Sequence, residues 1–178
     1  SKALRMFRVH EFENGAMGIT LPLGTEGLEI MFIKAGEATF ENLKETEENF
    51  LWGNNVNVTW KVFDHIELPK FKLNTLLDMK DRMSIISVKD AFNGKADFSA
   101  MFPQGRVPLN HLFSWTSIEI NEDGVHSGYV VEKANFPENY IPDDEPRHSF
   151  VLDLPFICSI RYMDETLLMA RILNPLKG

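Results

Sequence analysis

The fold is decided by a stretch that opens Leu112-Phe113-Ser114-Trp115-Thr116-Ser117-Ile118-Glu119-Ile120 and turns at Asn121-Glu122-Asp123-Gly124. We interpret residues 112–120 as a strand and the acidic, glycine-containing tetrapeptide as the turn that ends it. Residues 125–148 follow with little regular pattern, and the sequence becomes apolar again from Phe150 to Phe156. The chain therefore has strand-like sequence on both sides of a long irregular segment.

This irregular segment is not expected to form a helix. It contains Pro137, Pro142 and Pro146 together with the acidic run 143–145, and proline interrupts helical hydrogen bonding. Connections of this length are uncommon in a compact domain and are usually functional or disordered. We therefore expect a loop that is displayed for another protein to bind.

Length and composition predict an ordinary globular chain. Its 178 residues fit one domain, and 44% of them are hydrophobic and 25% charged, which permits a sizeable core. No apolar run approaches the ~18 residues of a membrane span, so no membrane partner is expected. The first residues do not read as a signal peptide and lead abruptly into strand-like sequence, which suggests a fragment or a processed chain.

The charge and the single cysteine exclude several classes of function. A net charge of −8 and the lack of a Lys/Arg cluster make nucleic acid an unsuitable partner. Cys158 lies in the apolar run 155–160 and is interpreted as a packed core thiol.

The triplet Asn57-Val58-Thr59 is a candidate glycosylation site at Asn57. We expect a secreted, extracellular glycoprotein rather than a cytoplasmic protein.

The remaining sequence predicts strands with few helices. Apolar patterning and turn residues predict strands and one C-terminal hairpin at 4–12, 16–23, 28–35, 56–62, 64–73, 156–162 and 166–173. Short helices are expected within 37–49, and a longer helix over 78–92 with Asp78 as its N-cap. Residues 93–108 read as a loop. The sum is an α+β fold with mostly antiparallel sheets.

Two of these strands carry more detailed expectations. Residues 56–62 alternate, so Val56, Val58, Trp60 and Val62 should share an apolar face and Asn57 should lie on the polar one. The strand at 64–73 contains Pro69, which predicts an edge position, a bulge or a strand junction. The strand at 28–35 is too apolar for a surface position and should lie deep in a sheet.

No motif for catalysis or cofactor binding is present. The sequence lacks a glycine-rich phosphate loop, a paired-cysteine zinc motif and a nucleophile elbow. His10 near Glu11 and Glu13 is interpreted as a solvated or hydrogen-bonded histidine, because a strand places His10 and Glu11 on opposite faces. The acidic run 143–145 lacks the spaced oxygen ligands of a calcium site. We expect that the chain binds no cofactor and is not an enzyme.

Four stretches together resemble one known family, the serpins. They are Leu68-Pro69-Lys70-Phe71-Lys72-Leu73, then Val88-Lys89-Asp90-Ala91-Phe92 with Ala96-Asp97-Phe98-Ser99, then Glu119-Ile120-Asn121-Glu122-Asp123-Gly124, and last Leu154-Pro155-Phe156 with Ile160-Arg161 and Leu168–Pro175. They resemble, in order, a central-sheet strand, a helix end with its loop, the strand before the reactive loop, and the C-terminal hairpin of that family. Each alone is weak, but their order and spacing match.

The resemblance implies that residues 1–178 are the C-terminal half of a single serpin domain, with several sheets, few helices and a long exposed reactive loop at 124–149. Its N-terminal half would be a partner, either in the same longer chain or as a separate fragment. The implied function is inhibition of a serine protease by a conformational switch. A protease cleaves the loop while covalently attached, and the freed loop inserts as a strand of the central sheet.

Residues of the implied loop fall into two groups. The hinge that would begin insertion is Glu122, Gly124, Val125, Ser127 and Tyr129. The bait position is open: counting along the family's usual loop length reaches Glu138-Asn139, whereas Lys133 and Arg147 are alternatives for trypsin-like proteases.

An alternative function is a non-inhibitory serpin that acts as a carrier, a storage protein or an interaction module. Inhibitory members follow the hinge glycine with small residues, whereas this chain has Val125-His126-Ser127-Gly128-Tyr129. In the inserted strand Tyr129 would be large and Lys133 would bury a charge. Ser114 also stands where the family usually has a histidine that helps to control sheet opening.

Overall fold

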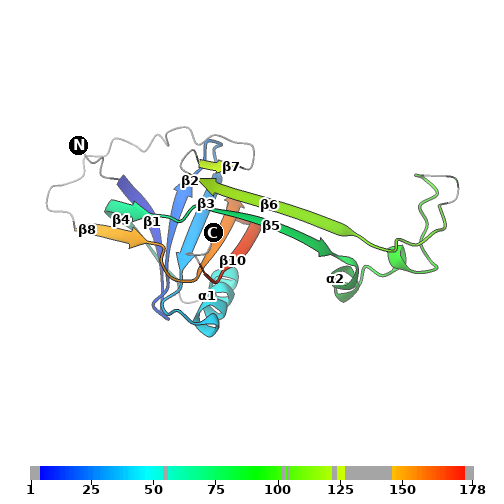
Figure 1. The fold of residues 1–178 in the computed structure, drawn as a ribbon, viewed down its shortest axis with the longest axis horizontal. Helices are drawn as coiled ribbons and strands as arrows, with labels where there is room; N and C mark the ends of the chain where they lie inside the picture. Colours follow the sequence, from blue (N-terminus) through cyan, green and yellow to red (C-terminus); the bar gives the residue numbers. More distant parts are fainter. Residues whose placement is uncertain are drawn as a thin grey trace. The chain divides into compact units, whose positions relative to one another are not determined.

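The computed structural model describes residues 5–53, 56–101, 103, 105–121, 124–126 and 146–174. Within this description the chain divides into two compact units. One unit comprises Ser1–Phe71 with Ile120–Gly178, and the other comprises Lys72–Glu119 (Figure 1). No helix in the described part of the chain is long and apolar enough to cross a membrane.

The first unit is built on a seven-stranded sheet with the order β10-β9-β3-β2-β1-β4-β8 (Figure 1). The strands are β1 (Arg5–Phe12), β2 (Met17–Pro22), β3 (Leu28–Lys34), β4 (Val56–Glu67), β8 (Arg147–Val151), β9 (Phe156–Tyr162) and β10 (Glu165–Ile172). Neighbouring strands are antiparallel except β4 and β8, which are parallel. The sheet therefore joins the chain before the long loop to the chain after it.

One face of this sheet is covered by helix α1 (Phe40–Trp52). The Thr39 side chain accepts a hydrogen bond from the Asn42 N–H, and Gly53 ends the helix at a φ of 65°, a conformation that suits glycine. Leu43 of α1 is fully buried. It belongs to a core cluster with Phe12, Ala16, Met31, Ile33, Ala35 and Ile157.

The opposite face holds an aromatic core. Phe156 is fully buried, and its ring lies 6.2 Å from that of Phe32 and 5.6 Å from that of Phe71, between centroids. Phe7 and Phe63, from neighbouring strands, make an edge-on contact at 5.9 Å. The apolar strand β3 contributes buried side chains to both faces, which confirms that it lies deep in the sheet.

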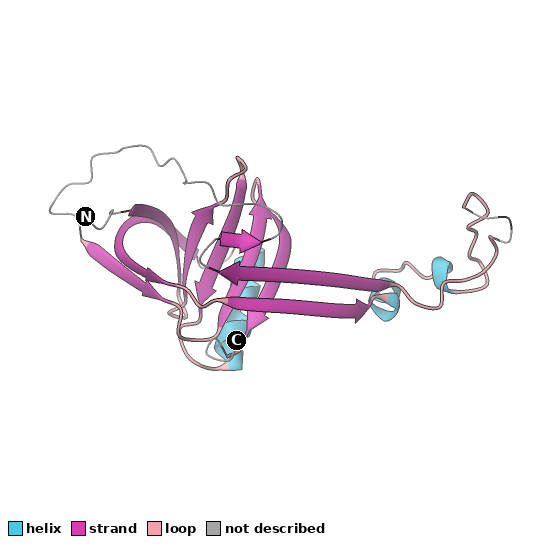
Figure 2. Cartoon of the chain, turned by 45° about the horizontal axis from the view of Figure 1, so that its top comes forward, coloured by secondary structure: helices cyan, strands magenta, loops and turns pink. Residues whose placement is uncertain are grey.

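A second sheet has the order β5-β6-β7, with β5 (Phe71–Asp78), β6 (Phe113–Asn121) and β7 (Gly124–His126). Figure 2 shows β5 and β6 side by side as a long ribbon. Lys72 bonds Glu119 at 2.8 Å, and Ser117 donates to Asn74 at 2.8 Å. The segment that connects the two strands contains α2 (Lys80–Ile85) and the 3-10 turn Asp90–Phe92.

The structure corrects the helix predicted over 78–92. Asp78 is the last residue of β5, although its side chain still accepts from the Lys80 N–H at 3.1 Å, as a cap would. Helix α2 ends at Ile85, and Ser87 has a φ of 68°. A positive φ at a residue other than glycine stops the helix, so the apolar spacing of 79–92 does not extend one helix.

The strands around Pro69 are also redrawn. The two strands predicted at 56–62 and 64–73 are instead β4, continuous to Glu67, and β5, which begins at Phe71. Pro69 therefore marks a strand junction, one of the three alternatives expected from its sequence. Val58 and Trp60 of β4 are 51% and 61% exposed, whereas Val62, on the same face, is fully buried.

Candidate functional site

The predicted reactive loop is described only at its two ends. Gly124 and Val125 lie in β7, directly after β6. Six of the predicted hinge and bait residues lie outside the described residues: Glu122, Ser127, Tyr129, Lys133, Glu138 and Asn139. The site is therefore built from the strands that begin and end the loop.

The C-terminal stem of the loop is the edge strand β8. It pairs in parallel with β4, with a register shift between Phe63 and His65 of that strand. Phe150 is 1% exposed, and the next buried residue, Leu152, donates its backbone N–H to the Glu67 carbonyl at 3.0 Å. Packing and backbone pairing together fix where the loop ends.

Arg147 is placed within this stem. It pairs with Val62 of β4, and its Nη1 atom is buried without a hydrogen-bond partner among the described residues. A bait side chain must enter the specificity pocket of a protease, so a half-buried arginine within a ladder is poorly placed for this role. This placement argues against Arg147 as the bait, and Lys133 and Glu138-Asn139 stay predictions outside the described residues.

Two other residues considered for chemistry are buried. Cys158 is fully buried, and burial raises the pKa of its thiol to about 12, which confirms an unreactive core thiol. His10 is 8% exposed, and its Nε2 lies 3.1 Å from the Thr20 hydroxyl oxygen. Of the two alternatives for His10, the hydrogen-bonded histidine is confirmed. No group of three His, Cys, Asp or Glu residues in the described ranges could hold a metal ion.

The burial of His10 predicts acid sensitivity. Desolvation, then Arg8 and Arg161, lower its pKa from 6.5 to about 4. The unfolded chain therefore binds a proton below pH 6.5 that the folded chain does not bind until about pH 4. As the pH is lowered from 6.5 towards 4, the free energy of unfolding should therefore fall by on the order of 2–3 kcal/mol.

Urea unfolding at pH 7.5, 5.5 and 4.5 measures this effect in the purified protein. The His10→Gln variant keeps a hydrogen-bonding side chain without a titrating ring, so it should lose most of the pH dependence. The matched control is His65→Gln, because the His65 side chain is 52% exposed. An unchanged pH dependence in His10→Gln would contradict the assignment.

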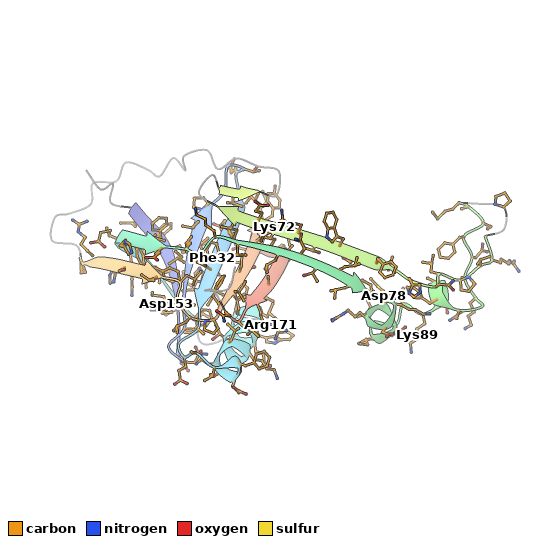
Figure 3. All side chains as sticks on the ribbon, viewed as in Figure 1. Phe32, Lys72, Asp78, Lys89, Asp153 and Arg171 are labelled. Carbon is orange, nitrogen blue, oxygen red and sulfur yellow. The ribbon has the colours of Figure 1, made fainter. Side chains whose placement is uncertain are left out.

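A pair missed by the sequence reasoning joins the ends of β5 and β6. His111 Nδ1 lies 2.6 Å from Asp78 Oδ2, and the Leu112 N–H donates to the same carboxylate at 3.3 Å. The His111 hydrogen bond is the first cause that lowers the pKa of Asp78, to about 2. The two residues are 33 positions apart, so only the pairing of β5 with β6 brings them together (Figure 3 labels Asp78).

Known proteins resemble this chain over much of its length. Serpin B10 of Bos taurus is 29% identical over 163 residues, which cover 90% of this chain and 37% of that protein. The leukocyte elastase inhibitor of Bos taurus is 28% identical over 116 residues, 62% of this chain and 29% of that protein. The chain spans less than half the length of the curated relatives it matches.

Solved structures share the fold. The crystal structure of Serpin48, described as a highly specific serpin of the insect Tenebrio molitor, matches with a TM-score of 0.67 and 23% identity. The match covers 96% of this chain and 44% of that chain. The predicted α+β, multi-sheet fold, as a part of a larger one, is therefore confirmed.

The relatives also correct the predicted location. Secretion was expected, but the curated relatives include Serpin B proteins, which are mainly intracellular. The extracellular prediction is wrong, because the triplet at Asn57 is compatible with secretion but does not require it. Glycosylation of Asn57, an exposed residue of β4, loses its support with secretion.

The family assignment rests on nearly the whole chain. A sequence model of the family described as Serpin (serine protease inhibitor) matches residues 2–175. This range includes every strand that the structure describes in the two sheets. The chain therefore belongs to the serpin family of serine protease inhibitors.

Proposed function

We propose that residues 1–178 are the C-terminal portion of a single serpin domain that inhibits a serine protease, with residues 124–149 as its bait loop. The observation that carries this proposal is the placement of the loop's two ends. Gly124 begins a strand beside β6, and Arg147–Val151 forms an edge strand anchored by the buried Phe150. A loop with both ends fixed in sheets can be presented to a protease.

The proposed switch requires more central-sheet strands than the described residues supply. In the unit Lys72–Glu119, large apolar side chains are exposed: Leu76, Leu77, Ile85, Ile86, Val88, Met101, Val107, Leu112, Phe113 and Trp115. So much exposed apolar surface is typical of an interaction site. It supports an N-terminal half of the fold as partner, within one longer chain or as a separate fragment. A stable monomer of 20.4 kDa in mass and size analysis would contradict this partner.

The non-inhibitory alternative is favoured by the hinge sequence. Val125 and Tyr129 replace the small residues of inhibitory members, and Ser114 replaces the usual histidine. Slow insertion would let a protease cleave the loop and dissociate before it is trapped. Such a serpin would act as a carrier, a storage protein or an interaction module.

One experiment separates the two functions. The complete protein, with the N-terminal half of the fold present, is incubated with serine proteases that cleave after lysine, acidic or uncharged polar residues. The products are examined by denaturing electrophoresis. An inhibitor is expected to form a covalent complex that survives denaturation. Cleavage of the loop without any complex, for every protease, would contradict inhibition.

A hinge variant tests whether the bulky hinge side chains limit insertion of the loop. The double variant Val125→Thr with Tyr129→Ala removes the two bulky side chains from the face that would be buried on insertion. The trapped fraction of protease should rise several-fold, because insertion competes with release of the cleaved product. Val130→Thr with Glu132→Ala, changed on the opposite face, is the matched control and should leave the fraction unchanged. An equal response of both pairs would argue against the predicted insertion register.

A further inference from the structure

Immediately after the proposed bait loop, the chain leaves the edge strand of the first sheet and enters a strand in its interior. β8 is the last strand in the sheet order, whereas β9, the next strand in the chain, lies beside β3. Residues 152–155 therefore connect the edge strand β8 to β9, which begins beside Lys34 at the end of β3. This crossing segment sets where β8 can lie.

Lys34, the last residue of β3, holds the crossing segment by its side chain. Its Nζ donates to the Val151 carbonyl at 2.9 Å and to Asp153 Oδ1 at 2.9 Å. The adjacent Ala35 N–H donates to the Pro155 carbonyl at 2.9 Å. Figure 3 labels Asp153 in this segment. One end of β3 thus contacts the last residue of β8 and both sides of the crossing.

The Lys34 side chain is partly buried, so its ammonium group needs these hydrogen-bond acceptors. Its side chain is 26% exposed, and it follows the buried residues Phe32 and Ile33. A half-buried ammonium group is costly without partners. The two acceptors described for Lys34 are the carbonyl of Val151, the last residue of β8, and the carboxylate of Asp153 in the crossing segment. The bond from Lys34 is the first cause that holds the pKa of Asp153 below its usual range.

We propose that Lys34 is a positioning residue that fastens the C-terminal stem of the bait loop and keeps β8 paired with β4. The role in presenting bait rests on the proposed function, whereas the fastening of β8 does not. Among the strands that the structure describes, β8 is short, lies at the edge of its sheet and pairs in parallel with β4. Parallel pairing is slightly weaker per residue. Side-chain hydrogen bonds outside the backbone ladder are therefore important for keeping β8 paired with β4.

Hydrogen exchange measured by mass spectrometry on the purified protein tests the fastening. Lys34→Met keeps the unbranched apolar stem and removes the charged donor, so exchange at residues 147–151 should become about 10-fold faster, the effect of losing charge-assisted hydrogen bonds. Exchange in β1 and β2 should change less than twofold, which excludes general unfolding. Lys34→Arg keeps a donor and should restore slow exchange. Asp153→Asn should give an intermediate rate.

Lys44→Met is the matched control, because Lys44 forms an exposed pair with Glu48 at 3.8 Å on α1. It should leave exchange in β8 unchanged. Equal exchange in β8 for Lys34→Met and the wild-type protein would overturn the proposal, as would failure of Lys34→Arg to restore it.

A second readout separates this inference from the proposed function. In an inhibitor, Lys34→Met should lower the trapped fraction of protease, and Lys34→Arg should rescue it. A protein that inhibits no protease but still shows selective loosening of β8 would support the fastening and contradict the proposed function. Intact trapping with unchanged exchange would overturn the fastening alone.

Discussion

In the complete protein, with the N-terminal half of the fold present, a single cleavage between Lys133 and His148 is expected to raise the melting temperature by about 20 °C or more. The expectation follows from insertion of the freed loop as a strand of the central sheet. A dozen new ladder hydrogen bonds at ~1 kcal/mol each would stabilise the cleaved form by on the order of 10 kcal/mol. The measurement is thermal unfolding, followed by circular dichroism, before and after limited proteolysis.

A hinge variant provides the control for this cleavage. Ser127→Arg places a charge on the face of the loop that would be buried on insertion, and an unpaired buried charge is strongly unfavourable. The cleaved variant should melt within a few degrees of the uncleaved protein. An unchanged melting temperature in the cleaved wild-type protein would mean that the loop stays outside the sheet, and the non-inhibitory function would then be favoured.

Replacing Phe156 by alanine is expected to lower the free energy of unfolding by about 3–5 kcal/mol, the usual cost of removing a buried phenylalanine. Phe156 is fully buried, and it is the residue whose ring joins Phe32 of β3 to Phe71 at the start of β5. The loss combines the apolar surface left unburied with a cavity that neighbouring strands cannot close. Urea unfolding of the purified variant measures it.

Phe113→Ala is the matched control for this substitution. Phe113 is 62% exposed, and its ring stacks on that of His111 at 5.4 Å. In residues 1–178 without the proposed N-terminal partner half, its loss should cost less than about 1 kcal/mol, as for exposed positions and single ring contacts. Similar costs for the two variants would mean that the core does not centre on Phe156.

The strands that could be predicted from sequence have patterns that are local. The apolar run of β3 and the hairpin of β9 and β10 each depend on residues close together in the chain. The same holds for Cys158, whose apolar neighbours indicated a core position. The helix over 78–92 failed for a local reason too, because nothing in its spacing signalled the positive φ at Ser87.

Contacts between distant residues could not be predicted. Lys34 with Asp153, 119 positions apart, and Asp78 with His111, 33 positions apart, carry no shared sequence pattern. The exposure of Val58 and Trp60 had the same origin. Alternation shows that two residues share a face, but only the packing of other elements decides whether that face is covered.

By itself, the sequence determined the family, the strand-rich composition and the position of the long loop, because these depend on motif order and on local patterning. Only the tertiary structure decided that β8 pairs in parallel with β4, that Arg147 lies within that ladder and that Lys34 reaches the strand after the loop. The physical reason is that a sheet orders its strands by hydrogen bonds between segments far apart in the chain. Those bonds form between backbone groups, which are alike in almost every residue, so the strand order leaves little trace in the sequence.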